Sequence, residues 1–425
     1  MTSPTASAAS RPLLVLGAGA RPYREHGLSR LAAAGPLVLA DPEPPAWIRP
    51  YVDEQLAIDL ADTEGAAMAV KAVAARTPLA GVCTYLEHHV ELTAHLAAVL
   101  GLPGTPPGAM AACRDKALTR ARFAEHGVPS ARSVPVDDAD EAVEAARRIG
   151  YPVVVKPRGM GGSAGVVHAD HDVAVREAFY AALSATVIGL EAYATRGVLV
   201  EEYLEGPEIS AETVVVDHQV HIVAITRKQL GREPRFVETG HMVDARDPLL
   251  GDDAVTQAVT DAVRALGIER GVLHVEVRLT GRGPALIEVN GRPGGDLIPL
   301  LVEEATGIDL MAAAAALACG TRPELSATRQ RAAAVQFLLP AFTGRHGPVP
   351  PLTDLRAQPW LERLVWTRHL GEKVTAPPKS TIGDRLAHWV VTADTPEECR
   401  QHLNQALLEV CAPTAFTGHT TGCTR

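Results

Sequence analysis

The stretch Gly271–Asp296, GVLHVEVRLTGRGPALIEVNGRPGGD, constrains the fold more than any other part of this chain. Apolar residues alternate with polar ones over Val272–Leu279, and a second apolar run covers Ala285–Val289. The segment Thr280–Pro284 between them contains two glycines and a proline, which favour a turn. The pattern predicts a β-hairpin.

Four polar residues of this hairpin share faces. Side chains alternate along a strand, so Glu276 and Arg278 lie on one face of the first strand, and Glu288 and Asn290 lie on one face of the second. In a hairpin the two faces are adjacent, which brings two carboxylates and an amide oxygen together, with Arg292 just beyond. Oxygen ligands of this kind suit Mg²⁺. A surface hairpin with ion-paired charges is the other interpretation, and the spacing alone does not separate the two.

Length and composition limit the classes of protein to consider. A chain of 425 residues is long enough for two or three domains. The net charge of −10 argues against a nucleic-acid-binding surface. The six cysteines show no zinc-type or disulfide-framework spacing, so we expect a reducing, cytoplasmic location. Met1–Ser10 is expected to be a disordered tail, and the apolar run Met311–Cys319 is too short to cross a membrane.

The N-terminal region predicts an open α/β domain over residues 11–112. An apolar strand, Pro12–Leu16, leads into Gly17-Ala18-Gly19, and a later strand ends at Asp41. A nicotinamide dinucleotide site is one interpretation of this pattern. However, proline occupies position 22, where the third glycine of that motif is required. We therefore expect these glycines to form a tight turn at the end of a strand.

Glu87 follows the next predicted strand of this domain, Leu79–Cys83. Open α/β sheets bind ligands just beyond the carboxyl ends of their strands, so Glu87 could hold an ammonium group. It could equally be an acidic residue that a helix N-terminus favours. Both interpretations stay open.

A lysine at the end of a strand precedes a glycine-rich segment. The strand Val153–Pro157 contains Lys156 and continues into Arg158–Val166, RGMGGSAGV. Lysine supplies positive charge for phosphate, and glycines allow backbone N–H groups to close on its oxygens. The order differs from a Walker A loop, where the lysine follows the glycines. A plain hairpin turn is the alternative.

Two acids bracket the next turn. Glu201 lies in the strand Val198–Tyr203, and Glu208 precedes the strand Ile209–Val216. Such a pair could bind an adenine amino group and a ribose, or it could be two surface acids. Farther on, Gly231–Pro248 shows no clean periodicity and predicts a substrate lid that carries His241.

These features occur together in one order that resembles the ATP-grasp superfamily of carboxylate–amine ligases. The resemblance covers residues 11–325 and rests on Lys116, Lys156 with its glycine loop, Glu201, Glu208, Glu276, Glu288, Asn290 and Arg292. Two segments, Phe236–His241 and Glu288–Asp296, are similar to the L-amino-acid ligases, which make dipeptides.

The resemblance implies an α/β ATP-grasp fold. The tail 1–10 would precede an N-terminal pre-ATP-grasp domain (11–112), and a two-part ATP-grasp domain (113–325) would carry the nucleotide and metal site. A small α+β subdomain without chemistry of its own would follow (326–425).

The resemblance also implies roles for individual residues. ATP would be bound by Lys116, Lys156, Gly159, Gly161, Gly162, Ser163, Gly165, Glu201, Tyr203, Leu204 and Glu208. Two Mg²⁺ ions, for which Mn²⁺ could substitute, would be bound by Glu276, Glu288 and Asn290. Catalysis would involve Lys156, Arg292, Gly294 and Gly295, and the amino acid substrates would contact Glu87, His241, Arg292 and Asp296. Some of these ligases carry a bulky aromatic residue where this chain has Asp296, so the resemblance does not indicate the size or charge of the substrate.

The activity that the resemblance implies is amide-bond formation. An amino acid carboxylate would be phosphorylated by ATP and then attacked by an amine, giving ADP and phosphate, in natural-product assembly. The alternatives are a ligase or carboxylase for a non-amino carboxylate, a D-amino acid or bicarbonate, and a nucleotide-binding protein without catalysis. We expect small-molecule partners, no nucleic acid, no membrane and assembly as a homodimer.

Overall fold

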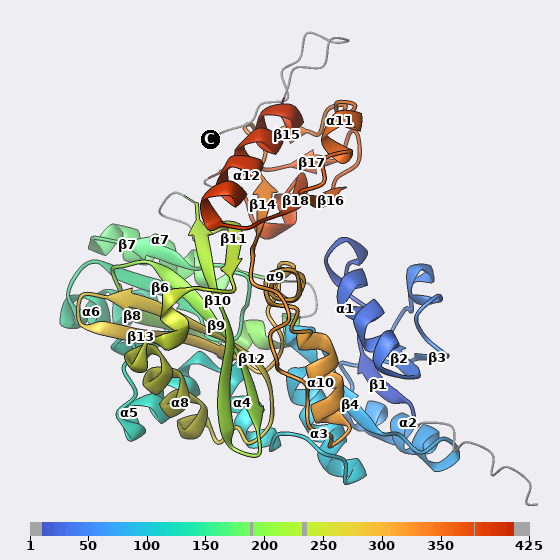
Figure 1. Cartoon of the computed structure of the whole chain (residues 1–425). Coiled ribbons are helices and arrows are strands. Elements are labelled where there is room, and N and C mark those ends of the chain that lie inside the picture. Colours follow the sequence, from blue (N-terminus) through green and yellow to red (C-terminus); the bar gives the residue numbers. More distant parts are fainter. Residues whose placement is uncertain (1–10, 188–189, 232–235, 378, 412–425) are drawn as a thin grey trace, which may run out of the picture.

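The computed structural model describes residues 11–187, 190–231, 236–377 and 379–411 (Figure 1). The predicted N-terminal tail lies outside these residues. The described chain forms an N-terminal α/β domain, a small antiparallel sheet with two helices, and a large antiparallel sheet that runs through the centre. None of the helices in these ranges is long and apolar enough to cross a bilayer.

The N-terminal domain is an open parallel sheet, as predicted. Its four strands lie in the order β3-β2-β1-β4. The elements are β1 (Leu13–Leu16), α1 (Arg21–Ala34), β2 (Leu37–Asp41), β3 (Glu54–Ala57), α2 (Thr63–Arg76), β4 (Gly81–Cys83) and α3 (Val90–Leu100). The strands are short and fully buried apart from β3, which lies at the edge.

The turn after β1 is closed by residues of its own domain. The Asp41 carboxylate accepts a hydrogen bond from the backbone N–H of Ala18 at 2.9 Å. Gly17 has φ +77°, and a Cβ there would lie 2.5 Å from the Leu86 side chain. The Leu86 side chain thus fills the space beside the turn, and the Asp41 carboxylate holds the turn through its hydrogen bond from Ala18. This arrangement supports the tight-turn interpretation over the dinucleotide one.

Two consecutive helices connect this domain to the next. They are α4 (Pro107–Arg114) and α5 (Lys116–His126), and the predicted boundary near residue 112 falls inside α4. The Asp115 carboxylate caps α5 by accepting from the N–H of Ala117 at 2.9 Å. Because Asp115 fixes the first turn of α5, the side chain of Lys116 is held at a defined position.

The small sheet presents the glycine-rich loop. Its strands are antiparallel in the order β5-β8-β6-β7. They are β5 (Ser133–Val136), β6 (Val153–Pro157), β7 (Val167–Ala169) and β8 (Val198–Glu202), with α6 (Ala139–Ile149) and α7 (Asp172–Leu183) packed against them. The buried face of α6 is mainly alanine, which lets the helix approach the sheet closely. The glycine loop connects β6 to β7, as its position after Lys156 predicts.

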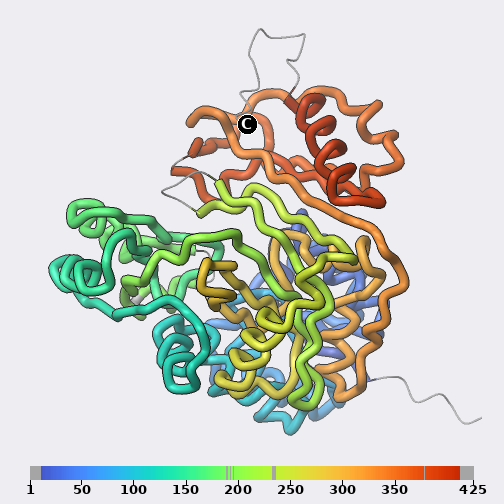
Figure 2. Tube along the Cα trace, turned by 60° about the vertical axis from the view of Figure 1, so that its left-hand side comes forward, coloured from blue at the N-terminus to red at the C-terminus, as the bar shows by residue number. Residues whose placement is uncertain are grey.

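The large sheet has eight strands in the order β13-β12-β9-β10-β11-β14-β18-β16. Figure 2 shows the path of the chain by colour, with the orange and red C-terminal part above the yellow part. They are β9 (Glu208–Val216), β10 (Gln219–Leu230), β11 (Glu238–Asp244), β12 (Gly271–Thr280), β13 (Gly283–Asn290), β14 (Ala332–Leu338), β16 (Leu361–Trp366) and β18 (Ala387–Ala393). The helix α8 (Asp253–Leu266) belongs to one apolar core, and α9 (Ile298–Thr306) and α10 (Leu310–Ala318) belong to another. The predicted hairpin is β12–β13, with Glu276 opposite Glu288 and His274 opposite Asn290.

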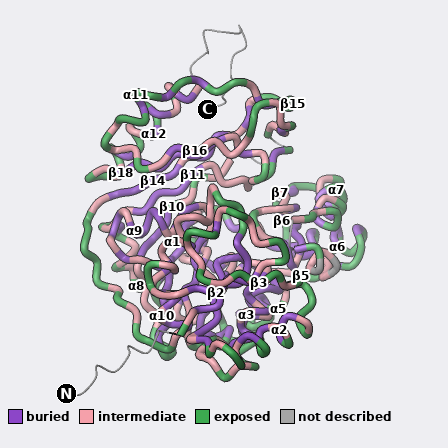
Figure 3. The backbone as a smooth tube through the Cα atoms, turned by 90° about the vertical axis from the view of Figure 1, so that its right-hand side faces the viewer, coloured by how far each residue is buried: buried purple, intermediate pink, exposed green. Residues whose placement is uncertain are grey.

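The C-terminal half differs from expectation in two places. Strand β11 takes up residues 238–244 of the predicted lid Gly231–Pro248 and lies inside the large sheet; residues 232–235 lie outside the described part. A strand buried on both faces shows no alternation, which is why the pattern was missed. In addition, β14 pairs directly with β11, so the strands after residue 326 extend the same sheet (Figure 3). The helix α12 (Pro396–Val410) covers β14 and β18.

Gly206 offers a test of the turn between β8 and β9. Its φ is +134°, and a Cβ there would lie 2.0 Å from the carbonyl oxygen of Leu279. We expect Gly206→Ala to lower the free energy of unfolding by about 1–3 kcal/mol from backbone strain alone. Urea unfolding measures this. Gly281→Ala, where a Cβ meets nothing within 4 Å, is the matched control and should change little. Equal stability of both variants would contradict the described turn.

His388 predicts how stability depends on pH. Burial, together with the charges of Arg363 and Arg385, lowers the pKa of this imidazole to about 3. The unfolded chain binds a proton there near pH 6.5 and the folded chain does not, so stability falls as pH decreases below about 6.5. The contribution is about 1.4 kcal/mol per pH unit.

We therefore expect His388→Phe to lose less stability between pH 6.5 and pH 5 than the unmodified protein, by about 2 kcal/mol. The replacement keeps a ring beside Tyr23 and Phe337. Thermal unfolding at the two pH values measures the difference, and exposed His126→Gln serves as the control. An unchanged pH dependence in His388→Phe would refute the assignment.

Candidate active site

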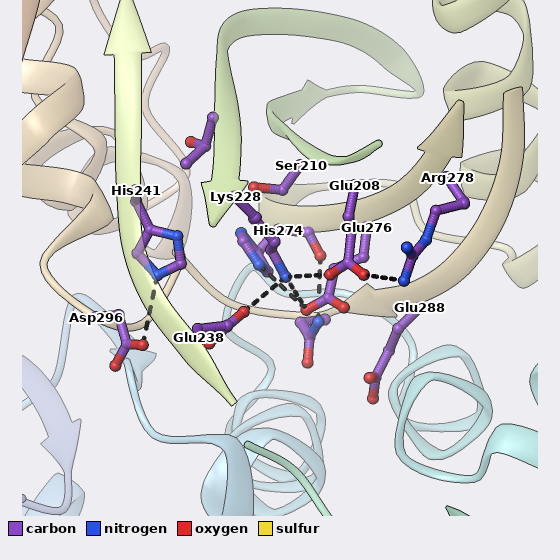
Figure 4. Close-up of polar contacts among 12 residues, drawn as sticks. Glu208, Ser210, Lys228, Glu238, His241, His274, Glu276, Arg278, Glu288 and Asp296 are labelled. Carbon is purple, nitrogen blue, oxygen red and sulfur yellow. Dashed lines mark hydrogen bonds and ion pairs between the residues drawn. The ribbon is translucent and has the colours of Figure 1, made fainter. Parts of the chain in front are cut away.

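Three lysines each contact carboxylates near the hairpin (Figure 4 shows part of this group). Lys116 Nζ lies 2.9 Å from Glu288 Oε1, and Lys156 Nζ lies 2.6 Å from Glu201 Oε2. The third lysine, Lys228, was missed from the sequence. These lysines come from α5, β6 and β10, so the fold brings together positive charges from three separate elements.

Lys228 has the largest number of carboxylate partners in this group. Its Nζ lies 2.9 Å from Glu238, 3.1 Å from Glu276 and 3.2 Å from Glu208, and its side chain is 1% exposed. Burial alone would lower the pKa of Lys228, but the three carboxylates outweigh it and raise the pKa well above its ordinary value. The sequence contains one indication that Lys228 is buried. Lys228 lies on the same face of its strand as Thr226, and the alternation of apolar residues along that strand predicts this face to be buried.

Glu276 is oriented by a buried histidine. His274 Nε2 lies 3.3 Å from Glu276 Oε1, and Nδ1 lies 3.0 Å from Glu212 Oε1. Burial opposes protonation of His274, but Glu212 outweighs it and raises the pKa to about 9. Ser210 donates to the Glu212 carboxylate at 2.7 Å. The imidazolium and Lys228 together keep the pKa of Glu276 well below its ordinary value, against the effect of burial.

The hairpin residues fit a divalent cation. Glu276 and Glu288 face each other across β12 and β13, and Asn290 donates its amide nitrogen to the His274 carbonyl at 3.4 Å. That hydrogen bond leaves the Asn290 amide oxygen available as a ligand. Both carboxylates contact lysines through one oxygen, Oε1, so a bound cation would share each carboxylate with a lysine or take the place of that lysine.

The glycine loop is held over this site. Arg114 donates to the Gly159 carbonyl at 2.8 Å, and Lys116 Nζ donates to the Met160 carbonyl at 2.7 Å. The loop needs left-handed backbone at Gly162, Ser163 and Gly165. A Cβ on Gly162 would lie 2.9 Å from Ile382, and one on Gly161 would lie 3.7 Å from Glu87. The loop thus spans from the N-terminal domain to the C-terminal strands.

The residues predicted for the nucleoside lie at one end of the site. Glu201 is buried between Lys156 and Arg120, whose Nε is 2.9 Å away, and these cations keep its pKa low although burial opposes this. Glu208 accepts from Arg278 at 2.7 Å. Tyr203 lies between the rings of His168 and Phe236, and Leu204 is buried. Arg120 and Arg278 were not predicted.

Glu87 is bound by two arginines. Its carboxylate lies 2.6 Å from Arg114 Nη1 and 2.5 Å from Arg292 Nε. Burial would raise the pKa of Glu87, but the positive charges of Arg292, Arg114 and Lys116 outweigh this and lower it to about 2. From the sequence, the partner of Glu87 could be a substrate ammonium group or a helix N-terminus. In the structure the carboxylate instead holds Arg292 in place.

Asp296 is likewise held by an arginine, which the sequence did not predict. Arg385 makes two hydrogen bonds of 2.8 Å to the Asp296 carboxylate, and His241 Nε2 lies 3.4 Å from it. Burial opposes ionisation of Asp296, but Arg385 and His241 outweigh it and keep the pKa well below its ordinary value. Arg385 precedes β18, so the C-terminal region, expected to have no chemistry, contributes to the site.

A second group of metal-ligand type does not fit a cation as well as the hairpin does. Glu238, His241 and Asp296 have ligand atoms within 4.8 Å of one another. However, Glu238 contacts Lys228, and Asp296 contacts Arg385. Arg385 donates to both oxygens of the Asp296 carboxylate, so Asp296 is not free to bind an ion, and we assign no metal to this group.

The backbone after Arg292 presents two donors. Within the described ranges, no hydrogen bond uses the N–H of Gly294 or Gly295. The Gly295 carbonyl accepts from Ile298 at 2.9 Å, which fixes this turn at the start of α9. A Cβ on Gly294 would approach Ile298 to 3.0 Å. The two N–H groups are therefore available to a ligand next to Arg292.

Comparisons with known proteins agree with this geometry. Residues 149–299 match the family model of the ATP-grasp domain, and residues 38–104 match that of the ATP-grasp N-terminal domain. The described fold is also that of a solved L-amino acid ligase from Bacillus licheniformis, with TM-score 0.79, 23% identity, and coverage of 95% of this chain and 98% of that chain. The chain therefore belongs to the ATP-grasp superfamily.

Curated relatives include two ligases. Human carnosine synthase 1 (Homo sapiens) is 28% identical over 347 residues, which is 76% of this chain and 41% of that protein. The D-alanine–D-alanine ligase of Desulforudis audaxviator is 32% identical over 209 residues, which is 46% of this chain and 64% of that protein. The chain thus spans about two fifths of the length of the first relative.

Lys228 gives a test of the exchange between lysine and metal. We expect Lys228→Met to be destabilised by about 3–5 kcal/mol, because three carboxylates lose their shared cation. Added Mg²⁺ should raise the melting temperature of this variant more than that of the unmodified protein, since the metal replaces the lost charge. Lys71→Met, an exposed site on α2, is the control. If Mg²⁺ shifts all three proteins equally, Lys228 does not occupy a metal position.

Proposed function

We propose that this protein is an ATP-dependent, ADP-forming ligase that joins the carboxylate of an amino acid to an amine. The observation that carries the proposal is a set of three buried lysines on carboxylates: Lys116 and Lys228 contact the hairpin acids, and Lys156 contacts Glu201. The glycine loop is tied to the same group through Lys116. The phosphates of ATP bring negative charge to the lysines, and Mg²⁺ brings positive charge to the carboxylates. Phosphates would bind Lys116, Lys156 and Lys228, and Mg²⁺ would bind Glu276, Glu288 and Asn290.

The number of metal ions is part of this proposal. The hairpin supplies only two carboxylates and one amide oxygen as ligands. Mg²⁺ takes its remaining ligands from water and nucleotide phosphates, so a few protein ligands can hold more than one ion. We propose two Mg²⁺ ions at the three hairpin residues, with Mn²⁺ as a substitute. When bound, they supply charge neutralisation for phosphoryl transfer.

Other residues would bind the rest of the nucleotide. Glu208 would bind the ribose hydroxyls, and the backbone of Tyr203-Leu204 would contact the adenine ring. Glu201 would accept from the adenine amino group while it also holds Lys156. In the loop, the N–H groups of Gly159, Gly161, Gly162, Ser163 and Gly165 would close on the phosphates.

The chemistry follows from the charges. A carboxylate is a poor acylating agent until phosphorylation gives it a good leaving group, and catalysis of that step is mainly positioning and electrostatics. Arg292 and the N–H groups of Gly294 and Gly295 would stabilise the oxyanion that forms when the amine attacks. Losing one such donor typically costs about 3–4 kcal/mol of barrier. The glycine loop would exclude water from the acyl phosphate.

The choice of an amino acid substrate rests on the relatives. The printed names include carnosine synthase, D-alanine–D-alanine ligase and L-amino acid ligase. One observation favours a second candidate, a ligase for a non-amino carboxylate. Glu87, the acid proposed to meet the substrate ammonium, is already bound by Arg114 and Arg292. His241 and Asp296 would then line the side of the pocket toward β11.

The deciding experiment measures phosphate release from Mg·ATP. The twenty L-amino acids are supplied as a pool, then singly and in pairs, and products are weighed by mass spectrometry. We expect release that requires an amino acid and a product of summed mass less water. Release with other carboxylates only would favour the second candidate.

A variant ties the activity to the hairpin. Glu288→Gln removes a proposed metal ligand and should lower kcat by about 100-fold or more, because even outer partners of metal ligands cost 10–100-fold. Glu144→Gln, an exposed site on α6, is the matched control and should keep full activity. A fully active Glu288→Gln protein would refute the proposed site.

Cytoplasmic location, a homodimer and a role in natural-product assembly remain predictions beside this proposal.

A further inference from the structure

The segment Arg114–Lys116 holds the start of the glycine loop, Arg158–Met160, and each of its three residues makes one of the contacts. From donor to acceptor, the contacts are Arg114 to the Gly159 carbonyl (2.8 Å), Arg158 to the Asp115 carboxylate (2.7 Å) and Lys116 to the Met160 carbonyl (2.7 Å). Of these three residues, Arg114 is the one that also contacts Glu87. Arg114 therefore links the loop to the N-terminal domain.

The guanidinium of Arg114 donates in two directions. Its Nη2 donates to the Gly159 carbonyl, and its Nη1 lies 2.6 Å from Glu87 Oε1. The side chain is 0% exposed, so neither contact is lost to water without cost. A guanidinium is planar and rigid, so the directions of its two Nη donors are fixed relative to each other. A shift of the loop at Gly159 therefore also turns the donor that holds Glu87.

Glu87 carries this constraint on to Arg292. Its second oxygen, Oε2, lies 2.5 Å from Arg292 Nε, and Arg292 Nη1 donates to the Pro293 carbonyl at 2.9 Å. Among the described residues, no hydrogen bond uses Nη2 of Arg292. That nitrogen is left for a substrate oxygen while the pair with Glu87 stays intact. The loop is thus connected to the proposed oxyanion donor through Arg114 and Glu87.

The occupancy of Glu87 decides whether Arg114 can hold the loop. A carboxylate with both oxygens free pairs with a guanidinium through two parallel hydrogen bonds. Here Arg292 occupies Oε2, so Arg114 takes Oε1 alone and its second donor is left for the Gly159 carbonyl. Without Arg292, Arg114 is expected to turn both donors to Glu87 and to release the loop. The loop would then depend on Arg292 without touching it.

Tyr193 closes the other side of Gly159. A Cβ on Gly159 would lie 2.7 Å from the Tyr193 Cβ. The centre of the Tyr193 ring lies 4.7 Å from the guanidinium carbon of Arg114 and 4.5 Å from that of Arg196, which pairs with Glu91 of α3 at 3.0 Å. Gly159 is therefore fixed between Arg114 and Tyr193, and it is the docked end of the loop.

We propose that Arg114 is a positioning residue that couples docking of the glycine loop to the position of Arg292. When the loop is docked, Arg114 and Glu87 hold Arg292 where it meets the reacting carboxylate. When the loop opens, that hold is lost. The proposal rests on the proposed ligase function and deepens it, because the coupling would restrict the reaction to a site closed to water.

The first experiment measures hydrogen–deuterium exchange of the peptide 158–166 in the ligand-free protein by mass spectrometry. Arg114→Gln should accelerate exchange by about tenfold, the change expected on losing one hydrogen bond from a charged donor. Arg292→Gln should also accelerate it, because Arg114 then turns to Glu87. Arg122→Gln, an exposed site on α5, makes the same chemical change as the matched control and should leave exchange unaltered.

The double variant Arg114→Gln/Arg292→Gln tests the route of the coupling. If Arg292 acts on the loop through Arg114, the double variant should exchange no faster than Arg114→Gln alone. Additive effects would mean two independent causes and would overturn the coupling. Unchanged or slower exchange in Arg292→Gln would overturn it as well, and Arg114 would then be a structural tie of the loop and no more.

Arg114→Lys separates the coupling from the stability of the fold. A lysine keeps the positive charge beside Glu87, but its ammonium group does not fix the relative directions of two partners. We expect Arg114→Lys to melt closer to the unmodified protein than Arg114→Gln does, while its loop exchanges about as fast as in Arg114→Gln. Full loop protection in Arg114→Lys would overturn the geometric argument. If Arg114→Gln does not fold, Arg114→Lys takes its place in the double variant.

Turnover distinguishes this proposal from the ligase function on which it rests. Mg·ATP is supplied with the twenty L-amino acids as a pool, and released phosphate and condensed products are both measured. Arg114→Gln should lower kcat and raise the phosphate released per condensed product, because water reaches the acyl phosphate in an open site. Arg122→Gln should keep the unmodified ratio, and the same ratio in Arg114→Gln would overturn the coupling. If no variant forms a product but the exchange results hold, the ligase function fails and the coupling stands.

Discussion

The pairing of buried lysines with buried carboxylates is the interaction on which the rest of the site depends. Lys116, Lys156 and Lys228 come from three separate elements and meet acids of β8, β9, β11, β12 and β13. Charges in this environment are costly unless they are paired. The Lys116–Glu288 pair joins α5 to the large sheet, and the Arg120–Glu201 pair joins α5 to the small sheet. The same lysines and carboxylates are the groups that phosphates and Mg²⁺ would bind. Because each ligand would replace a partner that the other ligand draws away, metal and nucleotide are expected to favour each other's binding.

The continuous large sheet decides which parts of the chain reach the substrate end. The strands β14 and β18 extend the sheet that contains the hairpin, and this positions Arg385 against Asp296. The guanidinium carbon of Arg385 lies 3.7 Å from the centre of the Phe337 ring. The N-terminal domain contributes Glu87, which binds Arg292. Three regions of the sequence thus meet along the segment that contains Arg292 and Asp296. This explains why the substrate pocket is more difficult to predict than the nucleotide site.

Local patterns were sufficient where the chemistry lies on neighbouring residues. Alternation and turn residues predicted the β12–β13 hairpin, and its register placed Glu276 opposite Glu288. A lysine at a strand end followed by glycines predicted the loop after Lys156, because that backbone needs residues that tolerate left-handed φ. The parallel N-terminal sheet followed from short apolar strands alternating with helices. The strand β11 was missed, since a strand buried on both faces has no alternation to detect.

The sequence by itself determined the superfamily, the hairpin and the residue types of the nucleotide site, because strand period, turn chemistry and the order of motifs are properties of neighbouring residues. Only the tertiary structure decided the partner of each charge. It placed Glu87 between two arginines and gave Lys228 three carboxylates. Ion pairing depends on distances between residues far apart in the chain, and those distances exist only after the sheets and the N-terminal domain have packed together.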